Sequence, residues 1–254
     1  MRTAEVLFVA AMLTICEASV LAGQSPSPGT APYTQYGEPP VMDNTIFYHL
    51  LFDQLEGRTN GPDNEFRWDG EGWIGTDMNK LWFKSEGFVE HGRMTDGDQE
   101  ALYDHPIPHL KFFDVQAGVR YDLDSDPGRT WGAIGIEGLA PHFFEFAPTF
   151  YFSNRDFFAG RVEGSYDILI TNRLIAQPQF ELNFYSKRDP SREIGSGLSE
   201  LDTGLRLRYE ITRKFAPYIG VAYNGKFGET ADFTRAEGGI VNDVRFVFGI
   251  RLWY

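Results

Sequence analysis

The last fourteen residues of the chain, 241–254, constrain the fold more than any other stretch. Apolar side chains occupy every second position up to the terminal Tyr254, and charged residues such as Arg245 and Arg251 stand among the positions between them. Successive residues of a strand point to opposite faces, so this stretch has one apolar and one largely polar face. A last strand that pairs with the first and ends on an aromatic residue is typical of a closed membrane barrel.

The same period of two recurs along most of the chain. In residues 113–123, apolar side chains alternate with polar residues or glycine, with no exception. Such alternation predicts strands, and about twelve segments of roughly ten residues show it. The predicted strands are 47–56, 66–75, 80–90, 100–104, 113–123, 130–138, 144–152, 158–168, 174–184, 201–211, 215–223 and 244–254. We therefore expect an all-β fold, a transmembrane antiparallel up-and-down β-barrel of about 12 strands of the outer-membrane type.

The connections between these segments alternate in length. Outer-membrane barrels have tight periplasmic turns and longer outer loops, and an even number of strands places both termini on the periplasmic side. Connection 153–156 belongs to the outer loops by this alternation but is shorter than the others. The short connections are 76–79, 106–109, 139–142, 171–172 and 212–214, and the longer ones are 57–64, 91–99, 124–128, 187–199 and 228–239.

Composition excludes several classes of protein. The net charge is −13, and no basic stripe is present to neutralise phosphates, so no nucleic-acid partner is expected. No apolar run of about twenty residues follows the N-terminus, so no transmembrane helix is predicted. No enzyme is expected, because no G-x-S-x-G motif appears and His142 has no evident serine partner.

The N-terminus resembles a secretory signal peptide. Arg2 precedes an apolar run from Val6 to Ile15, and the small residue Ala22 suits cleavage after position 22. We therefore expect a signal peptide over 1–22, a flexible Pro/Ser/Gly-rich lead-in over 23–41 and the barrel over 42–254. Cys16, the only cysteine, would leave with the signal peptide, so export to the outer membrane is predicted without disulfides.

The polar face of the strands carries charges of both signs. In a lumen only about twelve strands wide, side chains can largely fill the interior. The charges therefore have two interpretations: a salt-bridged plug that holds the barrel rigid, or a charge-selective pore. The residues concerned are Arg120, Arg161, Glu163, Asp167, Glu181, Arg206, Arg208, Glu210, Arg245 and Arg251.

An ordered set of motifs resembles one known family. The clearest is Trp73-Ile-Gly-Thr-Asp-Met-Asn-Lys-Leu-Trp82, and others lie at 52–56, 114–120, 128–141, 166–175, 194–199, 204–211 and 215–220. Together they resemble the copper resistance protein B family of Gram-negative outer membranes. The resemblance implies copper tolerance and the binding of copper, as Cu(I) or Cu(II), as cargo. The implied partners are outer-membrane lipid, the assembly machinery that reads the C-terminal strand, and periplasmic copper proteins.

One feature departs from the family pattern. Many members carry an N-terminal tail rich in methionine and histidine, whose sulfur and imidazole ligands suit copper. Here residues 23–40 contain neither residue, and only Met42 stands just before the barrel. Copper capture by such a tail is therefore not expected.

The remaining candidate ligands gather at the predicted periplasmic end. His105-x-x-x-His109, helped by Asp104, would suit one ion, although turns are polar without any metal and methionine also fills gaps in apolar cores. The periplasmic candidates are Met42, His49, Met78, His105, His109 and His142, and the outer-loop candidates are His91 and Met94. A small-solute channel without a metal role and a purely structural barrel stay open as alternatives.

Overall fold

The computed structural model describes residues 45–61, 64–90, 92–123, 128–154 and 156–254. Nearly all of this part of the chain is strand. The strands are β1 (Phe47–Thr59), β2 (Asn64–Gly75), β3 (Lys80–Glu90), β4 (Arg93–Pro106), β5 (Phe113–Asp122), β6 (Arg129–Ala140), β7 (Phe144–Ser153), β8 (Phe157–Ser165), β9 (Ile168–Leu169), β10 (Leu174–Tyr185), β11 (Gly197–Tyr209), β12 (Phe215–Lys226) and β13 (Asn242–Trp253).

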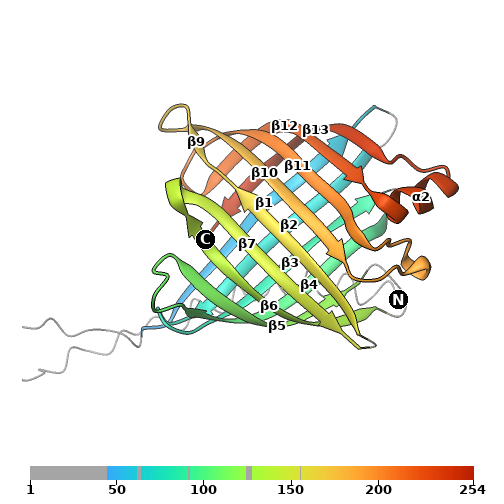
Figure 1. Cartoon of the computed structure of the whole chain (residues 1–254). Helices are drawn as coiled ribbons and strands as arrows, with labels where there is room; N and C mark the ends of the chain where they lie inside the picture. The colour runs from blue at the N-terminus through green and yellow to red at the C-terminus, as the bar shows by residue number, and fades with distance from the viewer. Residues whose placement is uncertain (1–44, 62–63, 91, 124–127, 155) are drawn as a thin grey trace, which may run out of the picture. The chain divides into compact units, whose positions relative to one another are not determined.

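These strands form a closed barrel (Figure 1). Strands that are neighbours in the chain pair antiparallel, except β8 with β9, and β13 returns to pair with β1. The two-residue β9 and the longer β8 both pair with β10 at different heights, so they make up one position in the wall. The predicted antiparallel barrel of 12 strands is confirmed. Among the described residues, no helix is both long and apolar enough to cross a bilayer.

The C-terminal residue completes the closure. Leu50 and Tyr254 exchange two backbone hydrogen bonds, with N···O distances of 2.9 and 2.8 Å. The ring of Tyr254 stacks on that of Tyr48, with 6.2 Å between centroids. The alternation in the last strand therefore places its apolar row on the outer wall, up to the seam itself.

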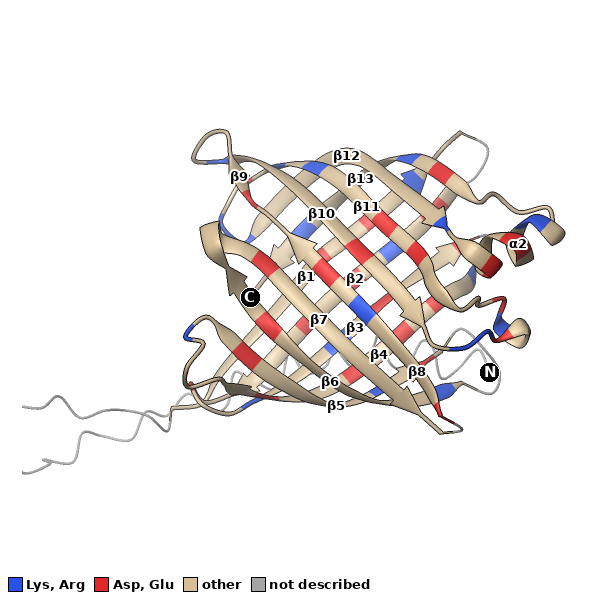
Figure 2. Ribbon diagram, viewed as in Figure 1, with Lys and Arg blue, Asp and Glu red and all other residues tan. Residues whose placement is uncertain are grey.

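The distribution of side chains is inverted relative to a water-soluble protein. Large apolar residues such as Phe248 and Ile219 are exposed on the outer wall, whereas Arg206 and Glu56 are almost completely buried. Charged residues recur along the strands from one end of the barrel to the other (Figure 2). Lipid can cover the apolar wall, and the charged face then lines the lumen.

Several strands are longer than predicted, and the extensions of β1 and β4 change the outer connections most. β1 runs to Thr59, and β4 starts at Arg93, where a loop up to residue 99 was expected. The connections 60–63 and 91–92 are therefore short, and the prediction of long outer loops was wrong at these two places. The physical reason is that Arg58 and Asp98, which look like loop residues in the sequence, find ion-pair partners inside the lumen.

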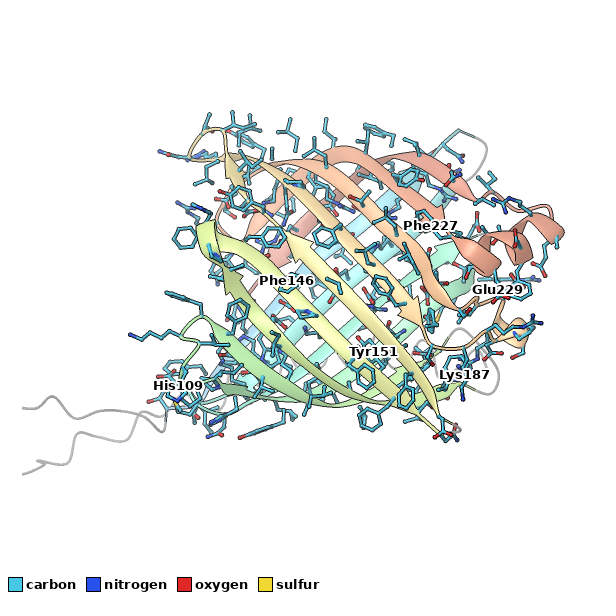
Figure 3. The ribbon with its side chains drawn as sticks, viewed as in Figure 1. His109, Phe146, Tyr151, Lys187, Phe227 and Glu229 are labelled. Carbon is cyan, nitrogen blue, oxygen red and sulfur yellow. The ribbon has the colours of Figure 1, made fainter. Side chains whose placement is uncertain are left out.

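The long connections that remain lie at one end of the barrel. Residues 186–196 contain a short 3-10 turn, η3 (Pro190–Arg192), and residues 227–241 contain the helix α2 (Gly228–Ala236). A second 3-10 turn, η2 (Pro141–Phe143), joins β6 to β7 at the opposite end. Lys187, Phe227 and Glu229 lie far from His109 along the barrel (Figure 3). We call the end with His109 and the start of β1 the periplasmic rim, following the usual topology.

Candidate functional site

The lumen is the only part of the described barrel that combines charge, burial and a cavity. A bulge in β1 helps to build it: Phe52 pairs with Gly70 and Gln54 with Asp69, so Asp53 is an extra residue. An extra residue shifts the alternation by one position. Asp53 and Gln54 consequently both line the lumen cavity, and inward positions change from odd to even numbers along β1.

Two arginines connect opposite walls of the barrel. Arg67 on β2 reaches β10 and β11, with its Nη2 3.2 Å from Glu181 Oε2 and its Nη1 3.3 Å from Asp202 Oδ1. Arg161 on β8 reaches β3 and β4, where it pairs with Glu86 and, at 2.8 Å, with Asp98. We call this group the ionic septum; it consists of Arg67, Glu86, Asp98, Arg161, Glu181 and Asp202.

The septum shares its partners. Glu181 also lies 3.4 Å from Arg161 Nε, and Glu86 also lies 3.6 Å from Arg67 Nη2. Both guanidinium groups are almost fully buried. The Nε and Nη1 atoms of Arg67 nevertheless find no hydrogen-bond partner in the described part of the chain. The septum thus holds two buried guanidinium groups across the lumen, and not all of their hydrogen-bond donors are satisfied.

A second ion-pair group adjoins the septum toward the outer end. Arg58 bonds Glu56 at 2.7 Å and Asp202 at 2.6 Å, and Arg206 bonds Glu56 at 2.7 Å. On the opposite wall, Arg120 pairs with Asp98 at 2.9 Å. Together with the septum these contacts tie eight strands to one another through the lumen. The residues that the alternation placed inside, such as Arg120, Arg161 and Arg206, are indeed there.

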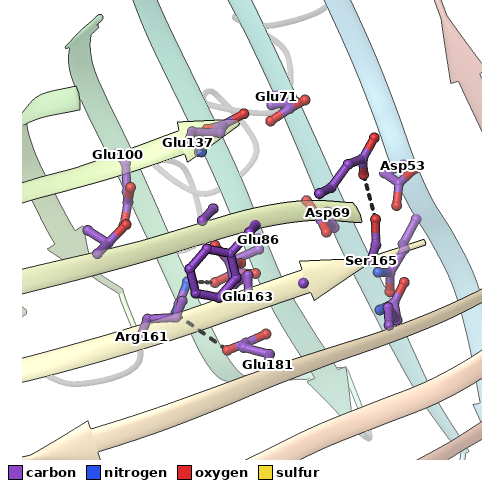
Figure 4. Close-up of a pocket in the computed structure, with 18 of the residues that line it drawn as sticks. Asp53, Asp69, Glu71, Glu86, Glu100, Glu137, Arg161, Glu163, Ser165 and Glu181 are labelled. Atoms are coloured by element: carbon purple, nitrogen blue, oxygen red, sulfur yellow. Dashed lines mark hydrogen bonds and ion pairs between the residues drawn. The ribbon is translucent and has the colours of Figure 1, made fainter. Parts of the chain in front are cut away.

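A cavity of about 470 Å³ borders the septum (Figure 4). Apart from septum residues, its lining comes mostly from the periplasmic halves of the strands, since Glu137 lies late in β6 and Glu145 early in β7. We call it the chamber. Five of the six septum residues, all but Asp202, also line it. Its acidic and basic lining residues are Asp53, Arg67, Asp69, Glu71, Lys84, Glu86, Asp98, Glu100, Glu137, Glu145, Arg161, Glu163, Glu181 and Arg251.

Acidic groups outnumber basic groups in the chamber lining. Some are paired: Lys84 lies 2.5 Å from Glu137, and Arg251 lies 2.6 Å from Asp53. The side-chain carboxylates of Asp69, Glu71 and Glu163 make no hydrogen bond or ion pair with the described residues. Oxygens of Glu86, Glu163 and Glu181 lie within 4.8 Å of one another. This all-oxygen set lacks the nitrogen and sulfur ligands that copper favours.

The candidate copper ligands occupy several different surroundings at the periplasmic rim. Met78 and His105 are in contact, because the Nδ1 atom of His105 lies 2.7 Å from the backbone oxygen of Met78. His109 is exposed in the turn before β5, and His142 is exposed in η2 with a φ of 69°. No described histidine belongs to a group of three His, Cys, Asp or Glu ligand atoms within 4.8 Å.

The expected help from Asp104 is wrong. Asp104 is 1% exposed and faces the lumen, where it lies 3.1 Å from Lys80 Nζ. His105 is the next residue of β4 and therefore faces outward, with its ring stacked on Tyr103. Met94 lies in β4 rather than in an outer loop. Met42 and His91 lie outside the described residues.

An inward-facing aromatic group at the periplasmic rim was not predicted. His49 lies between Trp73 and Trp253, with ring centroids 6.2 and 5.9 Å away, and Trp82 follows at 6.3 Å from Trp73. Each tryptophan lies an even number of residues from a lumen-facing residue of its own strand and therefore also faces inward. The lumen-facing residues are Asp69 for Trp73, Lys84 for Trp82 and Arg251 for Trp253. Of the candidate ligands that the structure describes, His49 is thus the one placed within the mouth of the lumen. The sequence carried a signal for this placement, because His49 and Asp53 both have odd numbers and therefore share one face of β1.

Comparison with known proteins gives consistent results. Residues 46–254 match the family model described as copper resistance protein B precursor. A copper resistance protein B of Escherichia coli is 44% identical over 214 residues, which cover 84% of this chain and 72% of that protein. A copper resistance protein B homolog of Pseudomonas syringae pv. tomato is 41% identical over 224 residues, which cover 88% and 76%.

One solved porin structure shares the fold. A NanC porin superimposes with a TM-score of 0.51 at 13% sequence identity, covering 81% of this chain and 99% of that chain. A KdgM porin covers 80% and 98%, with a TM-score of 0.47 at 12% identity. At such low identity the first likeness supports the barrel architecture alone.

Proposed function

The chain belongs to the copper resistance protein B family, and from this premise we propose that it acts in copper tolerance by binding copper at the periplasmic rim or assisting its passage outward. The observation that carries this proposal is the match of the family over the whole described barrel. A role without catalysis is proposed, with copper as cargo. The proposed location is the outer membrane, and the predicted signal peptide over 1–22 agrees with export.

The rim offers two kinds of copper ligand. The turn before β3 brings Met78 next to His105, and thioether sulfur and imidazole are both good copper ligands. His49 stands inside the mouth between two tryptophans. Copper delivered by a periplasmic copper protein would meet the exposed residues first and His49 next. His109 and His142 are exposed at the same rim and complete the set.

Copper titration of the full mature chain, refolded in detergent, tests the proposal. Cu(I) and Cu(II) are titrated separately, with zinc as the control metal. We expect saturable copper binding that weakens at least tenfold when Met78, His105, His109 and His142 are all replaced by alanine. A Met94→Ala, His91→Ala variant changes two ligand types at the opposite end and should bind as the wild type does. Unchanged binding by the fourfold variant would exclude the rim as the site.

A small-solute channel is the second candidate, favoured by the chamber. A barrel filled completely by side chains would leave no space of about 470 Å³. Conductance in planar bilayers separates this function from copper binding, because it requires no metal.

A further inference from the structure

We propose that the ionic septum is a gate, and that the lumen is a cation-selective pathway closed at rest by these ion pairs. The inference does not depend on the copper role. It starts from the way Arg67 and Arg161 span the lumen: from β2 to β10 and from β8 to β3, they join strands that lie far apart in the circular order of the wall. A hydrated ion cannot pass this level of the barrel without separating these pairs.

The septum closes only one level of the lumen. On its periplasmic side lies the open chamber, with Glu145 near the start of β7 and Arg251 near the end of β13. On its outer side the ion pairs continue, because Arg58 lies 2.6 Å from Asp202 and 3.9 Å from Glu65, which in turn lies 3.1 Å from Arg245. Charged groups thus continue from the chamber through the septum toward the outer end of the lumen, as a pathway for ions requires. A rigid plug would fill the chamber as well.

The contacts of the septum suit a barrier that opens reversibly. Glu86 and Glu181 each contact both arginines, so each guanidinium can exchange one carboxylate for another without losing its counter-charge. Arg67 also keeps two donor atoms unsatisfied in the closed state. A buried ionic network that is only partly satisfied is less stable than a fully bonded one. Rearrangement within the septum therefore does not leave a buried arginine without a counter-charge, which is the costly outcome.

Charge decides which ions the open pathway carries. The chamber lining contains more carboxylates than basic groups, and Asp69, Glu71 and Glu163 have no ion-pair partner among the described residues. Rings of carboxylates attract cations into a pore and repel anions. The solutes expected are small cations, and the direction of flow follows their gradient.

Planar-bilayer recording of the refolded full mature chain in potassium chloride tests the gate. The wild type should be closed for most of the record. An Arg67→Gln, Arg161→Gln variant should raise the mean conductance at least tenfold and, under a salt gradient, show a reversal potential that indicates cation preference. The matched control, Arg245→Gln with Arg251→Gln, removes the same two charges outside the septum and should stay closed.

A Glu86→Gln, Glu181→Gln variant removes the four ion pairs that these carboxylates make with Arg67 and Arg161, with the opposite change in charge, and keeps the pairs with Asp202 and Asp98. It should open as well, with a weaker cation preference. Folding of each variant is checked by its altered mobility in unheated gels. Wild-type conductance equal to that of the Arg67→Gln, Arg161→Gln variant, or closed records from both folded septum variants, would overturn the proposal.

Thiol labelling tests the gate without disturbing it. Glu145→Cys lies in the chamber, and Asn224→Cys lies on β12 toward the outer end, where Asn224 bonds Glu200 at 2.6 Å. In oriented vesicles a membrane-impermeant thiol reagent should label Glu145→Cys only from the periplasmic side and Asn224→Cys only from the outer side. Equally fast labelling of Glu145→Cys from both sides would show that the septum does not close the lumen.

Discussion

Single residues in this barrel matter according to where their charge lies. Arg206 is 1% exposed and is bonded through two nitrogen atoms to Glu56, whose own side chain is fully buried. Arg213 makes a similar pair with Glu210 at 3.0 Å, but its side chain is 79% exposed at the rim. The two arginines therefore form a matched comparison of the same contact inside and outside the lumen.

Arg206→Ala is expected to lower the free energy of unfolding by about 2 kcal/mol. Removing one partner of a buried pair costs about 3–5 kcal/mol when nothing replaces it, and here Arg58 still contacts Glu56. Arg213→Ala should change the value by less than about 1 kcal/mol, as exposed pairs do. Urea unfolding followed by tryptophan fluorescence measures both. Equal losses in the two variants would contradict this account of the lumen.

Among the elements, the β1–β13 seam is the one that closes the barrel. Tyr254 contributes backbone hydrogen bonds to Leu50 and a ring that stacks on Tyr48. Tyr254→Ala keeps the backbone hydrogen bonds and removes the stacked ring. We expect it to reduce the folded fraction recovered from outer membranes severalfold, whereas Tyr254→Phe should behave as the wild type does. Tyr209→Ala removes an equally exposed ring elsewhere on the wall and serves as the control. A normal yield of Tyr254→Ala would refute an aromatic requirement at the seam.

The outer loop 186–196 is expected to respond to pH in both directions. Burial opposes ionisation of Asp189, but hydrogen bonds from Ser191 and Arg129 and the charge of Arg129 prevail and lower its pKa. Burial and the neighbouring carboxyl of Glu237 raise the pKa of Glu193. The stabilisation that ionised Asp189 gives the loop is complete above the ordinary aspartate pKa of about 3.9, and it is lost as pH falls through the lowered pKa. The stabilisation that protonated Glu193 gives the loop is complete below the ordinary glutamate pKa of about 4.3, and it is lost as pH rises through the raised pKa.

Hydrogen exchange of this loop, corrected for the intrinsic pH dependence, measures the effect. Protection should be greatest near pH 4 to 5, where both contributions are largely present. Asp189→Asn should remove the decrease on the acidic side, and Glu193→Gln should remove the decrease at higher pH. A flat profile in the wild-type chain would show that neither carboxyl anchors the loop.

At the scale of the whole molecule, the barrel keeps its apolar side chains outside and its charges inside. The ion pairs across the lumen join strands that share no backbone hydrogen bonds. They therefore resist flattening of the barrel and also block its lumen. An apolar exception is the group formed by Leu102, Trp131 and Tyr151 inside the outer half of the lumen. The same interior thus combines a packed part, a charged barrier and an open chamber.

Much of this architecture follows from the sequence alone. Period-two alternation is a local property, so it predicted the strands, their inward and outward faces and the closing role of Tyr254. The motifs likewise indicated the family. Which charges meet is not local, because Arg67 and Glu181 are neighbours only once the wall has curved and closed. The bulge at Asp53, which reverses the parity of β1, the extension of β4 and the chamber beside the septum were decided only by the tertiary structure, since each depends on partners contributed by distant strands.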